Sequence, residues 1–225
     1  MISLSDLRQF KTNGRKFSCL TCYDASMAKA MELAEVDTIL IGDSLGMAIQ
    51  GRDSTLPVTV EDMAYHTAAV RRGNQHAFIM TDLPFMSYAT LNDALSSSKT
   101  VMQAGAQMVK MEGGAWLSEI VTVLTRNGIP VCVHLGLTPQ SVHVFGGYKL
   151  QARTREAADQ LIADCKAVVE AGAALLLLEC VPAQLGKEIS ELFPHIPVIG
   201  IGAGVDTDGQ VLVVQDMLGL TFGRV

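Results

Sequence analysis

Thr38-Ile39-Leu40-Ile41-Gly42-Asp43-Ser44-Leu45-Gly46 is the stretch of sequence that decides the fold. Four residues of mostly β-branched, apolar character run directly into a glycine, an acid and a serine. This pattern is typical of a strand that is buried on both faces and ends where its last side chains must reach solvent or a ligand. We therefore expect Asp43 and Ser44 to lie at the end of a buried strand.

The same pattern recurs along the chain, where three further apolar runs end in Asp82, Glu112 and Glu179. The expected strands span residues 17–22, 38–43, 77–82, 107–112, 130–134, 174–179, 197–202 and 210–216. Segments with a helical apolar stripe separate them, over residues 25–34, 59–72, 91–104, 116–126, 156–170 and 184–193. Alternating strands and helices with short turns imply parallel strands and right-handed crossovers.

Seven or eight such units in 225 residues predict an α/β protein, a (β/α)8 TIM barrel that forms a single domain over residues 1–225. The alternative is a doubly wound open sheet, which would usually carry a glycine-rich turn after the first strand. Tyr23-Asp24-Ala25 is not such a turn. The sequence ends at Val225, just after the expected eighth strand, so the C-terminal helix of the barrel is either missing or supplied from elsewhere.

Composition narrows the possible partners and the compartment. The net charge is −6 and no cluster of Lys and Arg occurs, so nucleic acid is not an expected partner. The sequence contains no long apolar run typical of a signal peptide or a membrane span. Five irregularly spaced cysteines argue against a disulfide framework and for a reducing compartment, so we expect a cytoplasmic protein. Cys19 and Cys22 would point to opposite faces of a strand, so they are not expected to share a metal ion.

Polar residues at strand ends are the candidates for chemistry, because barrel active sites lie at the carboxyl ends of the strands. A single acid there can merely cap the following helix. Four acids at the ends of four strands would repel one another unless a cation lay between them. The candidates are Asp24, Asp43, Ser44, Asp82, Lys110, Glu112, His134, Glu179 and Asp216.

Carboxylates without a His or Cys cluster predict Mg²⁺, which one or two carboxylates bind while water and substrate fill the remaining positions. Asp43 and Asp82 follow neighbouring strands and form the best ligand pair. Glu112 is expected to reach the metal through water. Lys110 points the same way as Glu112 and suits an anionic substrate oxygen. Alternatively, Lys110 is simply paired with a neighbouring acid.

Glu179 follows four leucines, so its carboxyl group is expected to have a raised pKa, which suits a base that takes a carbon-bound proton. The alternative is that Glu179 caps a helix beginning near Ala183. His134 ends the fifth strand, where it either orients a ligand or is a buried core histidine.

Several longer motifs together resemble the ketopantoate hydroxymethyltransferase family. The resemblance covers essentially the whole chain. The motifs are Gly42-Asp43-Ser44-Leu45-Gly46, Asp53-Ser54-Thr55-Leu56-Pro57-Val58-Thr59, Asp82-Leu83-Pro84-Phe85-Met86, Lys110-Met111-Glu112-Gly113-Gly114, His134-Leu135-Gly136-Leu137-Thr138-Pro139-Gln140, Phe145-Gly146-Gly147-Tyr148-Lys149, Leu178-Glu179-Cys180-Val181-Pro182 and Ile199-Gly200-Ile201-Gly202-Ala203-Gly204.

The resemblance implies a Mg²⁺-dependent transferase of pantothenate and coenzyme A biosynthesis. Such an enzyme moves a hydroxymethyl group from 5,10-methylenetetrahydrofolate, its co-substrate, to 3-methyl-2-oxobutanoate through a Mg-stabilised enolate, giving 2-dehydropantoate. Asp43, Asp82 and Glu112 match the metal site, Ser44 and Lys110 match substrate contacts together with the two aspartates, and Glu179 matches the general base. No residue is assigned to folate. Bacterial relatives are homo-oligomers, typically decamers, and continue beyond the position of Val225.

Two other functions remain open from the sequence. One is a different metal-dependent keto-acid barrel, such as a lyase of the isocitrate lyase kind, although the Lys-x-x-Cys-Gly motif of those lyases is missing. The other is a non-catalytic binding or scaffold protein, which would bind the keto acid without turning it over.

Overall fold

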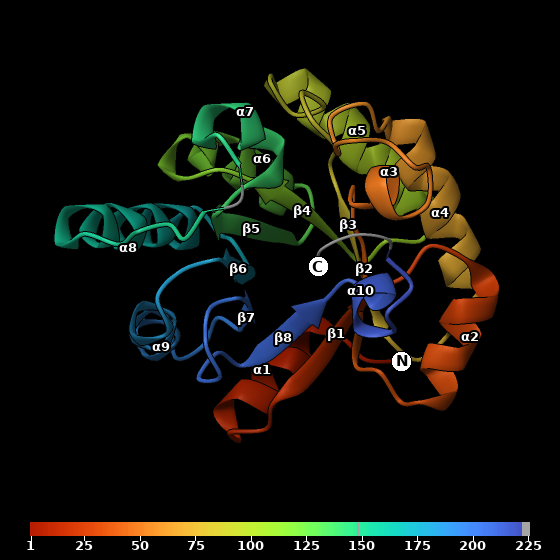
Figure 1. Cartoon of the computed structure of the whole chain (residues 1–225), viewed down its shortest axis with the longest axis horizontal. Helices are drawn as coiled ribbons and strands as arrows, with labels where there is room; N and C mark the ends of the chain where they lie inside the picture. The colour runs from red at the N-terminus through yellow and green to blue at the C-terminus, as the bar shows by residue number, and fades with distance from the viewer. Residues whose placement is uncertain (148, 222–225) are drawn as a thin grey trace. The chain divides into compact units, whose positions relative to one another are not determined.

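The computed structural model describes residues 1–147 and 149–221. Tyr148, which belongs to one of the motifs quoted above, and residues 222–225 lie outside the described residues. Eight strands form a closed barrel in the order of the sequence (Figure 1). This confirms the predicted (β/α)8 barrel, and the alternative of an open sheet is wrong. The strands are β1 (Phe17–Thr21), β2 (Thr38–Ile41), β3 (Phe78–Asp82), β4 (Met108–Glu112), β5 (Val131–Gly136), β6 (Leu175–Glu179), β7 (Val198–Ile201) and β8 (Gly209–Leu212).

Helices follow the strands largely as predicted. They are α1 (Leu4–Thr12), α2 (Ala25–Leu33), α3 (Leu45–Ala48), α4 (Val60–Gly73), α5 (Leu91–Gln103), α6 (Ser118–Arg126), α7 (Val142–Phe145), α8 (Arg155–Glu170), α9 (Ala183–Leu192) and α10 (Val214–Met217), with 3₁₀ turns η1 (Ala115–Leu117) and η2 (Pro139–Ser141). The prediction of a strand over residues 210–216 is wrong at its end, because β8 stops at Leu212 and Val214 begins α10. Among the described residues, no helix combines the length and apolarity that crossing a membrane would require.

The chain divides into two compact units, which are described separately. The first comprises Met1–Ile2, Ser18–Val109 and Val211–Val225. In it, β2 and β3 pair in parallel, with Thr38 opposite Phe78 and Ile41 opposite Thr81. Helices α2, α4 and α5 lie one beside the next along the outside of these strands (Figure 1). A Cβ atom at Gly73 would lie 2.2 Å from the carbonyl oxygen of Ala25, so only glycine allows α4 to end this close to α2.

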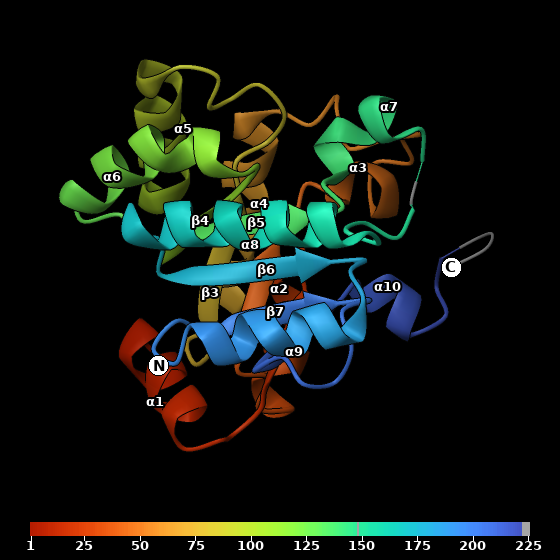
Figure 2. The same ribbon diagram turned by 90° about the vertical axis from the view of Figure 1, so that its left-hand side faces the viewer.

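The second unit comprises Ser3–Phe17 and Lys110–Gln210. Here β6 pairs in parallel with β5 and β7, and α8 and α9 lie on either side of it (Figure 2). Leu175 to Leu178 are all buried, which explains why this strand reads as an unbroken apolar run. Lys11 anchors α1 to this unit, because its ammonium group donates to the Asp208 carboxylate at 2.6 Å and to the Ser190 carbonyl oxygen at 2.9 Å.

All five cysteines are free, as predicted, and one of them makes stability depend on pH. Burial, with a smaller contribution from the charge of Asp164, raises the pKa of the Cys165 thiol in α8 to about 12. The thiol therefore stabilises the fold fully below the pKa of the unfolded chain, and this contribution is lost as the pH rises toward the folded pKa. We expect the free energy of unfolding of the wild type, relative to Cys165→Ala, to fall by about 2 kcal/mol between about pH 8 and about pH 10.5. Urea unfolding at each pH measures this difference, and parallel curves for the two proteins would contradict it.

Candidate active site

Asp43 and Asp82, the predicted metal-binding pair, come together in the first unit. Asp43 follows β2 and Asp82 ends β3, and the two residues are 3 % and 2 % exposed. The backbone N–H of Asp43 donates to Oδ2 of Asp82 at 3.0 Å. A Cβ atom at Gly42 would lie 2.7 Å from Ser44 Oγ and 3.7 Å from Asp82 Oδ2, so glycine keeps the approach to both side chains clear.

Tyr23 is a residue of this region that sequence reasoning missed. Its hydroxyl lies 2.8 Å from Ser44 Oγ. The pKa of Tyr23 is raised to about 12, mainly by burial. Ser44 and Thr21 oppose this rise, and the charges of Asp82 and Asp43 add to it. The two aspartates therefore lie close enough to act on the phenol by charge. The sequence signal was present, since Tyr23 directly follows an apolar strand, but the adjacent Asp24 fits the pattern of strand-end acids better.

Two of the nine candidates have structural roles. Asp24 is the N-cap of α2, where its carboxylate accepts a hydrogen bond from the backbone N–H of Met27 at 2.8 Å. Asp216 lies within α10 rather than at a strand end, and it accepts a hydrogen bond from the Thr221 hydroxyl. Asp24 therefore caps a helix and Asp216 makes a local hydrogen bond, and neither residue has the role in chemistry that was expected of it.

A second group of candidates meets in the second unit, around His134 of β5. Lys110 Nζ lies 3.2 Å from His134 Nδ1, and Glu112 Oε1 lies 3.3 Å from the same nitrogen. On the other side of the ring, Nε2 lies 3.2 Å from Glu179 Oε2. Lys110 Nζ is 3.9 Å from Glu112 Oε1. Lys110 is thus paired with a neighbouring acid, as the alternative interpretation expected, and it also contacts His134. The imidazole thus connects the Lys110–Glu112 pair with Glu179.

Burial and charge act in opposite directions on this group. Burial raises the pKa of Glu112, but its contacts with His134 and Lys110 and the N–H of Gln140, 2.9 Å from Oε2, outweigh burial and lower it. Burial and the charge of Lys110 lower the pKa of His134, whereas Glu112 and Glu179 raise it, to about 9. A proton on Nε2 of His134 faces Glu179 both in the imidazolium and in the neutral form whose Nδ1 accepts from Lys110. At 3.2 Å the contact between His134 Nε2 and Glu179 Oε2 is an ion pair when the ring is protonated, but it lacks the alignment of a hydrogen bond.

Glu179 is the most accessible member of this group. Its side chain is 16 % exposed, compared with 3 % for Lys110, Glu112 and His134. It does not cap α9, because the N-cap of that helix is Pro182, so the capping interpretation is wrong. Cys180, the next residue, has a left-handed backbone with φ of 49° that turns the chain away after β6. A carboxylate that is partly exposed and held by His134 is suited to accept a proton from a bound molecule.

The oxygen donors of the first unit fit a hard cation. Across residues 1–147 and 149–221, no three His, Cys, Asp or Glu side chains form a group arranged to hold a metal. Two buried carboxylates are nevertheless a sufficient protein contribution for Mg²⁺, which usually keeps several waters or substrate oxygens as ligands. The chemistry of Asp43 and Asp82 thus fits Mg²⁺ better than a zinc-type ion, which prefers His and Cys.

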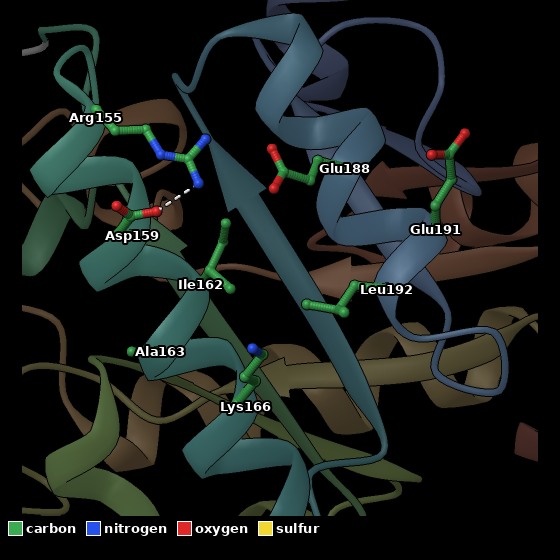
Figure 3. Close-up of a pocket in the computed structure, with 8 residues that line it drawn as sticks. All are labelled: Arg155, Asp159, Ile162, Ala163, Lys166, Glu188, Glu191 and Leu192. Carbon is green, nitrogen blue, oxygen red and sulfur yellow. Dashed lines mark ion pairs between the residues drawn. The ribbon is translucent and has the colours of Figure 1, made fainter.

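A groove of about 620 Å³ lies elsewhere in the second unit, between α8 and α9 (Figure 3). Arg155 and Asp159 form an ion pair of 2.8 Å at its edge, and Glu188 projects from the opposite helix. Ile162 and Leu192 supply its apolar part. None of the nine candidate residues lines this groove, so its size does not make it the candidate site.

Comparison with known proteins gives one consistent result. The family model for ketopantoate hydroxymethyltransferase matches residues 1–225. Proteins named 3-methyl-2-oxobutanoate hydroxymethyltransferase are 91 % identical in Acinetobacter baumannii (strain AYE), 85 % in Acinetobacter baylyi and 66 % in Psychrobacter sp. (strain PRwf-1). These alignments cover 100 % of this chain and 84 %, 84 % and 83 % of the relatives.

Solved structures that resemble this one share the fold alone. A 2,3-dimethylmalate lyase of the PEP mutase/isocitrate lyase superfamily superposes with a TM-score of 0.69 at 15 % identity, covering 97 % of this chain and 83 % of the lyase chain. A putative phosphonomutase from Burkholderia cenocepacia superposes with a TM-score of 0.71 at 14 % identity, covering 96 % of this chain and 95 % of the phosphonomutase chain. The sequence comparisons are far more specific, and they establish that this chain belongs to the ketopantoate hydroxymethyltransferase family of transferase enzymes.

Proposed function

We propose that this chain transfers a hydroxymethyl group from 5,10-methylenetetrahydrofolate to 3-methyl-2-oxobutanoate and so forms 2-dehydropantoate. The names of its relatives support the acceptor and the transferred group. The folate donor rests on the resemblance of the sequence motifs. The observation that carries the chemistry is the contact of 3.2 Å between His134 Nε2 and Glu179 Oε2, because it holds a partly exposed carboxylate where a carbon-bound proton can be taken.

Asp43 and Asp82 are proposed to hold Mg²⁺ directly, and Glu112 is proposed to reach it through water. Both oxygens of Glu112 already contact protein nitrogens, the backbone N–H of Gln140 and Nδ1 of His134, which suits a water-mediated role. When bound, the cation supplies positive charge beside the keto group and makes the neighbouring C3 hydrogen acidic. Ser44 and Lys110 are proposed to bind the anionic end of the keto acid through their hydroxyl and ammonium groups.

The proton and the electrons can be followed through the reaction. Glu179 takes the proton from C3, and the electron pair left on the substrate forms the new carbon–carbon bond to the one-carbon unit. Water supplies the oxygen of the new hydroxymethyl group and both carbon–nitrogen bonds of the one-carbon unit break. Tetrahydrofolate leaves with one proton from the water and the C3 proton passed on by Glu179. Lys110 and His134 stabilise the ionised form of Glu112, because each lies within 4 Å of that carboxylate.

The wider setting is also part of the proposal. The product would feed pantothenate and coenzyme A biosynthesis. The enzyme is proposed to act in the cytoplasm as a homo-oligomer, as its bacterial relatives are expected to do. Its partners would be a small keto acid and a folate, with no nucleic acid or membrane involved.

An assay with both substrates tests the proposed function directly. With Mg²⁺ present, we expect formation of 2-dehydropantoate that requires both the keto acid and methylenetetrahydrofolate and stops when EDTA removes the metal. NMR or mass spectrometry of the product measures this. Binding of the keto acid without turnover would favour a non-catalytic protein, and cleavage of a substituted malate would favour a lyase.

A further inference from the structure

Three hydroxyl groups form a chain beside the two aspartates of the first unit. The backbone N–H of Val214, the first residue of α10, donates to Thr21 Oγ1 at 3.0 Å. The side chain of Thr21 lies close enough to the Tyr23 phenol to oppose the rise in its pKa. The Tyr23 hydroxyl lies 2.8 Å from Ser44 Oγ. The chain thus leads from a backbone amide at one end to Ser44 at the other.

The amide at the first end is a donor only, because a backbone N–H cannot accept. Thr21 accepts there, and its own hydrogen is available for the oxygen of Tyr23. The phenol remains protonated at neutral pH, and its proton is available for Ser44 Oγ. Either hydroxyl of the Tyr23–Ser44 pair can be the donor. Where Tyr23 donates, the hydrogen of Ser44 is left for another acceptor. Ser44 is partly exposed, whereas Thr21 and Tyr23 are buried. In that case the hydrogen of Ser44 is therefore directed to the accessible side of this row of hydroxyl groups.

We propose that Tyr23 is a positioning residue, which fixes Ser44 as a hydrogen-bond donor toward the anionic end of the bound keto acid. This inference rests on the proposed function, in which Ser44 contacts that group. A serine beside two carboxylates could equally present an oxygen lone pair, which would repel an anion. In the proposed arrangement Tyr23 donates to one lone pair of Ser44, and the hydrogen of Ser44 is directed to the ligand.

The ends of the Tyr23–Ser44 contact are held firmly, as such a role requires. The Nδ1 atom of His66 lies 2.6 Å from the carbonyl oxygen of Tyr23, and the two rings meet edge to face with centroids 6.4 Å apart. On the other side, a Cβ atom at position 42 would lie 2.7 Å from Ser44 Oγ, so Gly42 leaves room for the hydroxyl in its present position. The hydroxyl pair is therefore ordered before any ligand binds.

The experiment measures the affinity for 3-methyl-2-oxobutanoate by calorimetry, with Mg²⁺ and without folate. Tyr23→Phe removes the hydroxyl and keeps the ring, and we expect its Kd to rise about tenfold, the effect of one hydrogen bond to a charged group. Tyr65→Phe is the matched control, because Tyr65 lies on α4 with 70 % exposure. Thr21→Val interrupts the chain one step earlier, and we expect a smaller rise in the same direction. Thermal unfolding identifies any variant that fails to fold, and Thr21→Val then carries the test alone.

A double-mutant cycle separates an effect through Ser44 from an independent one. In a Ser44→Ala background, Tyr23→Phe should raise the Kd by less than about twofold, because the group it orients is gone. An equal tenfold rise in both backgrounds would overturn the inference and leave the proposed function standing. If Ser44→Ala by itself left the Kd unchanged, the assignment of Ser44 within the proposed function would fail, and the inference with it.

Discussion

Replacing Glu179 by glutamine is expected to slow exchange of the C3 hydrogen of 3-methyl-2-oxobutanoate with D₂O by at least about 100-fold, the lower range for loss of a general base. Glutamine has nearly the same size, and its carbonyl oxygen can still lie beside His134 Nε2, which is 3.2 Å from the carboxylate. It cannot take up a proton. NMR of the substrate in D₂O with Mg²⁺ and no folate isolates this step from the transfer that follows.

The matched control is Glu188→Gln, because Glu188 is an exposed acid on α9 of the same unit and its loss changes the net charge equally. Its exchange rate should equal that of the wild type. Calorimetry should show that Glu179→Gln still binds the keto acid with little change in Kd. Exchange at the wild-type rate in Glu179→Gln would mean that another group removes the proton.

The barrel could be predicted because its strands are buried on both faces, and such strands read as unbroken apolar runs. All the residues of β2, β3 and β4 are buried, including the polar residues that end β3 and β4. The end of the last strand could not be predicted in this way. Val213 and Val214 have strand propensity, but Thr21 accepts the N–H of Val214 and a helix begins there. A contact across 193 residues of sequence thus overrides the local preference.

The candidate site was predictable to a similar extent. The period of two in strands places Lys110 and Glu112 on one side of β4, and both contact His134. That His134 of β5 would contact both residues, and that Tyr23 would meet Ser44, depends on neighbours that no local spacing shows. Asp24 was a wrong candidate for a related reason. An acid that directly follows a strand can also be the N-cap of the next helix, and Asp24 accepts the backbone N–H of Met27 in this way.

Replacing Asp82 by asparagine is expected to remove most of the Mg²⁺ affinity of the protein. The side chain would keep its shape and its acceptor for the N–H of Asp43, now 3.0 Å from Oδ2, but would lose the charge. A cation that binds only the folded protein raises its stability by mass action. We therefore expect millimolar Mg²⁺ to raise the Tm of the wild type and to leave that of Asp82→Asn nearly unchanged, with calorimetry giving a Kd at least about 100-fold higher, because one of only two anionic ligands is gone.

Two variants set the scale for this loss. Asp206→Asn neutralises an exposed acid and should respond to Mg²⁺ as the wild type does. Glu112→Gln should weaken binding by only about tenfold, the lower range for groups that hold a metal through an intermediary, because both oxygens of Glu112 already face Gln140 N–H and His134 Nδ1. A larger loss in Glu112→Gln than in Asp82→Asn would make Glu112 the direct ligand. An unaltered Mg²⁺ response in the double variant Asp43→Asn/Asp82→Asn would exclude the proposed metal site altogether.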